Sequence, residues 1–125
     1  MNPYARPNAY RENAIMTATP EQLVVMLYDG AGRFLRQAEG SMLDGSWLVA
    51  SEKLSRAEAI IDELLATLDM DAGEVADRLQ SIYIFCKTSL IQARIERDSV
   101  RIDQVARLLG ELREAWSQVR TTAVV

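Results

Sequence analysis

Apolar side chains recur at intervals of three and four residues along most of this chain, and no other feature restricts the fold as strongly. The pattern runs through three segments, at residues 47–68, about 74–97 and about 99–119, with Asp98 or Ser99 as the N-cap of the last. Such spacing puts side chains on one face of an α-helix and is typical of a bundle seam. The predicted inward-facing residues are Trp47, Ala50, Leu54, Ala57, Ile61, Leu64, Leu68, Val75, Leu79, Ile82, Tyr83, Cys86, Leu90, Ala93, Ile102, Val105, Leu108, Leu109, Leu112, Trp116 and Val119.

The segment Thr17–Ala38 predicts a further helix with a well-marked start. Thr19 can serve as the N-cap, and Pro20 occupies the first helical position, where its missing N–H costs nothing. Gln22, three residues after the cap, can complete a capping box. The helix is therefore predicted to begin at Pro20, and the glycine-containing stretch at residues 40–45 is predicted to end it.

Four helices joined by short connections allow few topologies. A helix of roughly twenty residues is about 30 Å long, and the turn signals at residues 40–45 and 69–73 leave only a few residues between neighbours. Short connections make sequential helices antiparallel. The sequence therefore predicts an all-α fold, an antiparallel up-down-up-down bundle of four long helices over residues 19–119. An N-terminal arm at residues 1–18 precedes it, and a flexible tail at residues 120–125 follows.

The opening helix carries more apolar surface than a helix facing a single core needs. Core packing is the better interpretation for the middle of this surface, at Met26, Leu27, Phe34 and Leu35. For the residues at its edges, partner or arm contact and burial at a bundle corner are equally good interpretations; they are Val24, Val25 and Tyr28.

Two glycines interrupt the same helix, Gly30 and Gly32. Each costs roughly 1 kcal/mol relative to alanine inside a helix. We expect the close approach of a second backbone to offset this cost.

A second apolar row occupies the third helix, on the side opposite its inward stripe. It consists of Ile84, Ile91 and Ile95, with Thr88 between them. Single exposed apolar residues are common, but an aligned row on the back of a helix marks a site for a partner. The row would have no such role if the helix were more central in the bundle, or if the arm covered it.

Composition narrows the range of functions. The chain has 125 residues, a net charge of −4, one cysteine and no histidine. The negative charge without a basic cluster argues against nucleic acid. The absence of histidine removes the commonest general base and the usual zinc ligand, so we expect no enzyme activity, metal or cofactor.

The sequence also bears on the location of the protein in the cell. A single cysteine fits a reducing cytosol, and no apolar run is long enough to span a membrane. We therefore expect a cytoplasmic protein.

Several short motifs occur in collinear order over nearly the whole chain. They are N-P-Y at 2–4, T-A-T-P-E-Q-L at 17–23, M-L-Y-D-G-A at 26–31, A-I-I-D-E-L-L-A-T-L-D at 59–69, A-R-I-E-R-D at 93–98 and L-R-E-A-W at 112–116. The motif at 17–23 followed by the one at 26–31 is the most specific combination. Together these motifs resemble the FliS family of flagellin-specific export chaperones.

The resemblance implies a helical bundle that binds the carboxy-terminal segment of newly made flagellin in the cytoplasm. Binding would block premature filament assembly, and the complex would be presented to the flagellar export gate. The resemblance also implies that the arm contributes to docking, which points to Tyr10, Ile15 and Met16. The chain departs from the family pattern at Ile84, where an acid is usual, and at Arg94, where an asparagine is usual.

A different class of function also fits the second apolar row, formed by Ile84, Thr88, Ile91 and Ile95. Two copies of the chain could pair through it as a structural homodimer, or the row could bind another flagellar partner as an adaptor. A concentration-dependent dimer would support the first of these.

Overall fold

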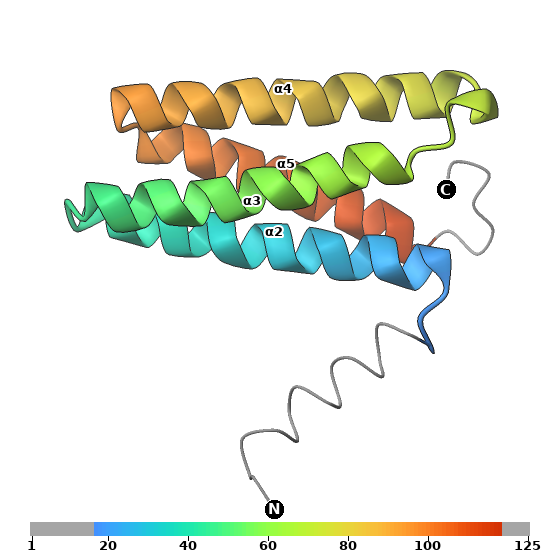
Figure 1. The fold of residues 1–125 in the computed structure, drawn as a ribbon, viewed down its shortest axis with the longest axis horizontal. Coiled ribbons are helices and arrows are strands. Elements are labelled where there is room, and N and C mark those ends of the chain that lie inside the picture. The colour runs from blue at the N-terminus through green and yellow to red at the C-terminus, as the bar shows by residue number, and fades with distance from the viewer. Residues whose placement is uncertain (1–16, 119–125) are drawn as a thin grey trace, which may run out of the picture.

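The computed structural model describes residues 17–118, and Figure 1 shows an antiparallel bundle of helices. The helices are α2 (Pro20–Leu43), α3 (Trp47–Thr67), α4 (Glu74–Glu96) and α5 (Ser99–Gln118), with a short 3₁₀ helix, η1 (Met70–Ala72), between α3 and α4. Each long helix runs opposite to the one before it. α2 packs on α3 and α5, and α4 packs on the same two helices from the other side. The predicted all-α, up-down-up-down bundle is confirmed. The predicted arm, apart from Thr17 and Ala18, and the predicted tail lie outside the described residues.

The start of α2 agrees with the prediction. The Thr19 side chain accepts a hydrogen bond from the backbone N–H of Gln22 at 3.2 Å, and the Gln22 side chain accepts one from the backbone N–H of Thr19 at 2.8 Å. This reciprocal pair is a capping box, with Pro20 as the first helical residue. Local sequence therefore fixes where the bundle begins.

The end of α2 differs from the prediction, because the helix runs through the first part of segment 40–45 and ends at Leu43. Met42 is buried, one helical turn after the buried Ala38, so core packing extends the helix past Gly40. The chain turns only at Gly45, whose φ of 77° lies in the left-handed region that glycine adopts easily. Tertiary burial thus overrides a local turn signal.

The residues that precede α3 and α5 differ in whether their side chains make a capping hydrogen bond. Ser46 precedes α3 without a capping hydrogen bond from its side chain. Asp98 does cap α5, because its carboxylate accepts hydrogen bonds from the backbone N–H groups of Val100 and Arg101. α4 ends at Glu96, and its C-cap Arg97 takes a left-handed conformation with φ 55° and places its guanidinium over the Trp47 ring, 4.6 Å from the ring centroid.

The inward face of α2 is rotated relative to the predicted one. Leu35 is fully buried as predicted, but Met26 is 36% exposed, and Leu27 and Phe34 are only partly buried. The buried seam of α2 instead consists of Val24, Tyr28, Ala31, Leu35, Ala38 and Met42. The helix contacts both α3 and α5, so its buried arc reaches farther round than a single-sided stripe.

Of the two glycines predicted to interrupt α2, Gly30 and Gly32, only Gly30 has a packing role. A methyl group added at Gly30 would lie 3.2 Å from Cδ1 of Ile60 on α3, whereas one added at Gly32 would meet nothing within 4 Å among the described residues. The close neighbour at Gly30 is therefore a side chain, and the expected approach of a second backbone is wrong.

Three aromatic residues from α2, α4 and α5 form a polar cluster inside the core. The hydroxyl groups of Tyr28 and Tyr83 are hydrogen-bonded to each other, and Nε1 of Trp116 donates to the Tyr28 hydroxyl at 3.2 Å. Burial raises the pKa of both tyrosines, so both stay neutral at physiological pH. The cluster ties three helices together at one level of the bundle.

Tyr28→Phe should lower the free energy of unfolding by about 2 kcal/mol, because it leaves the Trp116 N–H and the Tyr83 hydroxyl without their shared partner in a buried site. Urea denaturation checks this. Tyr83→Phe is the matched control and should cost less, because the Trp116 bond to Tyr28 survives. An equal or larger loss for Tyr83→Phe would show that Tyr28 is not the centre of the cluster.

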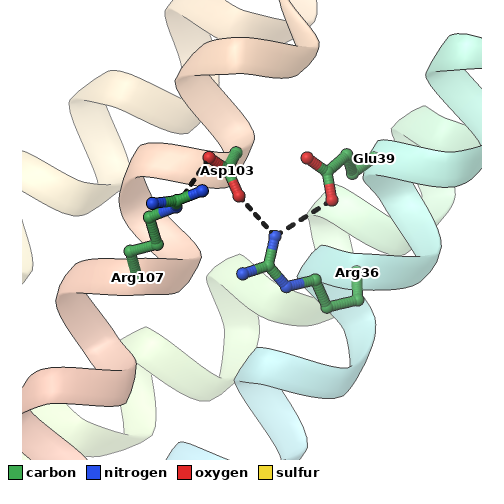
Figure 2. Close-up of polar contacts among 4 residues, drawn as sticks. All are labelled: Arg36, Glu39, Asp103 and Arg107. Atoms are coloured by element: carbon green, nitrogen blue, oxygen red, sulfur yellow. Dashed lines mark hydrogen bonds and ion pairs between the residues drawn. The ribbon is translucent and has the colours of Figure 1, made fainter.

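The seam between α2 and α5 is closed by ion pairs near its exposed edge. Nη1 of Arg36 contacts Asp103 at 2.6 Å and Glu39 at 3.0 Å, and Asp103 also pairs with Arg107 at 2.9 Å (Figure 2). Hydrogen bonding to Arg36 is the main reason that the pKa of Asp103 lies below its ordinary value. This face of the bundle is therefore charged and satisfied by its own partners.

The stabilising effect of Asp103 should depend on pH. Because its folded-state pKa is lowered, its contribution is fully present above the unfolded value of roughly 4 and is lost as pH falls through the folded value. The stability difference between the wild type and Asp103→Asn should therefore be larger at pH 7 than at pH 2, and smaller in high salt. Chemical denaturation at the two pH values measures it. A difference that does not change with pH would contradict the role assigned to this carboxylate.

Candidate binding surface

The outer face of α4 carries a row of exposed isoleucines. Ile84 is 51% exposed, Ile91 45% and Ile95 71%, and Thr88 between them lies on the same stripe. The spacing of four, three and four residues puts the four side chains on one side of the helix. The three isoleucines are thus exposed in the described part of the chain, as the sequence predicted. The role of the row in binding stays a prediction.

A more central position for α4 would bury its back and leave no row for a partner, but the structure contradicts this possibility. Within the described residues, α4 packs against α3, α5 and η1, and its inward face already holds the buried residues. Cover by the arm concerns residues 1–16, which lie outside the described residues. Tyr10, Ile15 and Met16, the predicted docking residues, fall in the same segment.

The structure corrects the predicted surface residues of α2. Val24 is 1% exposed and Tyr28 is 2% exposed, so neither can contact a partner without opening the core. Tyr28 is buried because it supplies the hydroxyl that both Tyr83 and Trp116 contact. The candidate surface therefore contains residues of α4 and none from the inward seam of α2.

Phe85 is an exposed aromatic residue that the sequence pattern does not single out. It is 60% exposed and lies on α4 beside Ile84. Its neighbours one turn away, Ser81 and Ser89, are polar, so Phe85 belongs to no periodic apolar row. The only feature of the sequence that could have indicated Phe85 is that it is a single aromatic residue outside the inward stripe of α4. Phe85 extends the apolar area of α4 away from the isoleucine row.

Polar contacts tie α4 to α3 close to the isoleucine row. Arg94 donates from Nε to the Ser51 hydroxyl at 3.0 Å and from Nη2 to the Ser55 hydroxyl at 3.2 Å, and it pairs with Glu58 at 2.8 Å. Farther along the same two helices, an ion pair joins Lys87 and Asp62; these contacts hold α4 against α3. They leave the isoleucines outside the seam between α3 and α4.

The described residues offer little that could carry out a reaction. Cys86 is fully buried, and burial raises the pKa of its thiol to about 11, which leaves almost no thiolate at neutral pH. Within residues 17–118, no group of three or more histidine, cysteine, aspartate or glutamate side chains could hold a metal ion. None of the helices in that range is long and apolar enough to span a membrane.

These features define a helical bundle with a row of exposed isoleucines on the outer face of α4. Comparison with known proteins identifies the family: the family model described as "Flagellar protein FliS" matches residues 1–123, and the chain belongs to this family. The flagellar secretion chaperone FliS of Salmonella typhimurium is 39% identical over 114 residues, which cover 90% of this chain and 84% of the relative. The corresponding chaperone of Bacillus subtilis is 33% identical, with 94% and 85% covered.

A solved structure supports the fold independently. A crystal structure described as a flagellar chaperone from bacteria superposes with a TM-score of 0.74 and covers 90% of this chain and 94% of its own, at 21% identity. At this level of identity the likeness concerns the fold alone. The family assignment rests on the sequence matches, and the chain is a member of a family of flagellar secretion chaperones.

Proposed function

We propose that this protein is a cytoplasmic export chaperone for flagellin. It binds the carboxy-terminal segment of the unpolymerised subunit, prevents filament assembly inside the cell and presents the complex to the flagellar type III export gate. The observation that carries the proposal is the exposed stripe of Ile84, Ile91 and Ile95 on a member of the FliS family. The protein acts by binding, without catalysis or a cofactor.

The physical requirements of such a client agree with this surface. A segment that is disordered when free loses conformational entropy on binding, and ordering it costs a few kcal/mol of the gross interaction energy. Apolar contacts must supply that energy. A row spaced by three and four residues presents them to the apolar face of a client helix, as in helix-in-groove recognition. The charged α2–α5 face, closed by Arg36 and Asp103, offers no comparable surface within the described residues.

Titration calorimetry of the purified protein tests the proposal. The carboxy-terminal segment of flagellin from the same organism should bind with a negative heat-capacity change, because apolar surface is buried. The amino-terminal segment of that flagellin, matched in length, is the control and should give no binding heat. Failure of the carboxy-terminal segment to bind would contradict the proposal.

The arm has a separate role in the proposed function. Tyr10, Ile15 and Met16 supply apolar side chains just before the start of α2 in the chain, and we assign them to docking at the export gate. Alanine substitution of these three residues should reduce flagellin secretion while calorimetry of flagellin binding stays unchanged. Loss of flagellin binding in that variant would instead place the arm in the client site.

A second candidate follows from the spacing of the isoleucine row. Ile84, Thr88, Ile91 and Ile95 repeat at four, three and four residues, which also suits the pairing of two helices along a coiled-coil seam. Two copies could therefore pair through α4 as a structural homodimer. Sedimentation separates the candidates: a dimer that Ile91→Asp dissolves, in a protein that does not bind flagellin, would favour this one.

A further inference from the structure

The isoleucine row on α4 is too small to hold a disordered segment by itself. From Ile84 to Ile95 it extends over about 16 Å of helix. A stable interface between two proteins takes about 20–30 residues from each partner. The flagellin segment of the proposed function must therefore contact more of the chaperone than this row.

Along α4, the apolar surface continues from the row in one direction within the described residues. On the N-terminal side of Ile84, the outer residues of the next two turns are polar and exposed; they are Asp77, Gln80 and Ser81. On the other side, α4 ends just after Ile95, and the start of α3 lies at the same end of the bundle (Figure 1). There Leu48, the second residue of α3, is 88% exposed, the largest value for a large apolar side chain among the described residues.

A hydrogen bond between α3 and α4 places Leu48 beside the end of the row. Arg94 precedes Ile95 in α4, and its Nε donates to the Ser51 hydroxyl at 3.0 Å. Ser51 is therefore on the side of α3 that faces α4. Leu48 lies three residues before Ser51, which puts the two side chains on the same side of the helix.

The contact between Arg97 and Trp47 fixes the same corner of the bundle. Trp47 adjoins Leu48, and Arg97 follows Ile95 by two residues; Cζ of Arg97 lies 4.6 Å from the centroid of the Trp47 ring. Trp47 is itself 39% exposed. The apolar surface of α4 is thus extended onto the start of α3 by Trp47 and Leu48.

We propose that the carboxy-terminal flagellin segment continues past Ile95 and binds Leu48 at the start of α3. This inference rests on the proposed function and adds a second helix to the client site. Residues 119–125 of the chain itself cannot take this place. They follow α5 at the opposite end of the bundle (Figure 1) and extend at most about 25 Å, less than the roughly 30 Å length of α5.

Titration calorimetry with the carboxy-terminal segment of flagellin from the same organism tests the contact. Leu48→Asp should weaken binding at least about ten-fold, because the client would desolvate the new carboxylate. Val49→Asp is the matched control: Val49 is also in the first turn of α3 and 46% exposed, but it lies about 200° round the helix from Ser51, away from α4. Its affinity should stay within about two-fold of the wild type.

The outcomes separate this inference from the proposed function. If the wild type does not bind the segment, the proposed function fails, and the inference fails with it. If the wild type binds and Leu48→Asp stays within two-fold, only the inference fails. An equal loss for Val49→Asp would also overturn it, because the effect would then come from the start of α3 in general.

Methyl NMR of leucine-labelled protein shows whether the contact is direct. The Leu48 signals should shift when the segment is added, while those of the fully buried Leu35 should change little. Unchanged Leu48 signals with bound segment would overturn the proposal. So would Leu48 signals that respond, without flagellin, to protein concentration or to removal of residues 2–16, because a second copy or the arm would then cover this corner.

Discussion

Ile91→Asp should weaken binding of the flagellin segment by roughly 30- to 700-fold, equivalent to about 2–4 kcal/mol. Ile91 is the central isoleucine of the row on α4, and its side chain is 45% exposed. A carboxylate at this position would be desolvated beneath a bound apolar helix with no partner for its charge, which is costly. Calorimetry measures the effect directly.

The matched control adds the same charge elsewhere. Gln37 is exposed on α2, the helix diagonally opposite α4, so Gln37→Asp should leave the affinity within about two-fold of the wild type. Both variants should keep the wild-type helix content, because neither position is in the core. Equal affinities for Ile91→Asp and the wild type would remove the isoleucine row from the binding site.

Leu35→Ala should lower the free energy of unfolding by about 2–5 kcal/mol. Leu35 is fully buried in the seam of α2 and packs in the core that all four helices share. Removing its branched end gives up buried apolar area and leaves a cavity that the neighbouring helices fill only in part. Since a domain of this size is stable by only about 5–15 kcal/mol, the change would remove a large part of its stability.

Leu43→Ala is the control for that substitution. It makes the same chemical change on the same helix, but Leu43 is 70% exposed, so the loss should stay below about 0.5 kcal/mol. Urea denaturation of the two variants gives the comparison. Similar losses at both positions would show that the inward face of α2 has been assigned incorrectly.

Long, regular apolar patterns made most of the fold predictable. Leu54, Ile61 and Leu64 are buried as predicted, as are Ile102 and Leu109. Trp47 and Val75, near the starts of their helices, were also predicted to face inward but are exposed. The start of α2 was predictable because its cap needs only residues close in sequence. These features depend on local chemistry and on a period that repeats for several turns.

Features set by packing between helices were less predictable. Gly40 resembles a helix end but lies inside α2, because Met42 is buried beyond it. The rotation of α2 depends on which two helices it contacts, so Tyr28 could be assigned equally well to the surface or to the core. Its hydroxyl is satisfied by Tyr83 and Trp116, 55 and 88 residues away in the chain, and no local pattern records such partners.

The candidate surface was predictable only in part. Ile84, Ile91 and Ile95 were recognised because they repeat on one side of a helix whose other side was already assigned to the core. Phe85 was missed because it stands alone, and an isolated exposed aromatic residue has no periodic signal.

Methyl NMR tests the central claim most directly, because it observes each isoleucine while flagellin binds. Protein labelled at the isoleucine δ1 methyl groups is titrated with the carboxy-terminal flagellin segment. The signals of Ile84, Ile91 and Ile95 should shift or broaden strongly, while those of the fully buried Ile61 and Ile102 should change little. Binding of the segment without a change at the three exposed isoleucines would contradict the assignment of the outer face of α4 as the flagellin site.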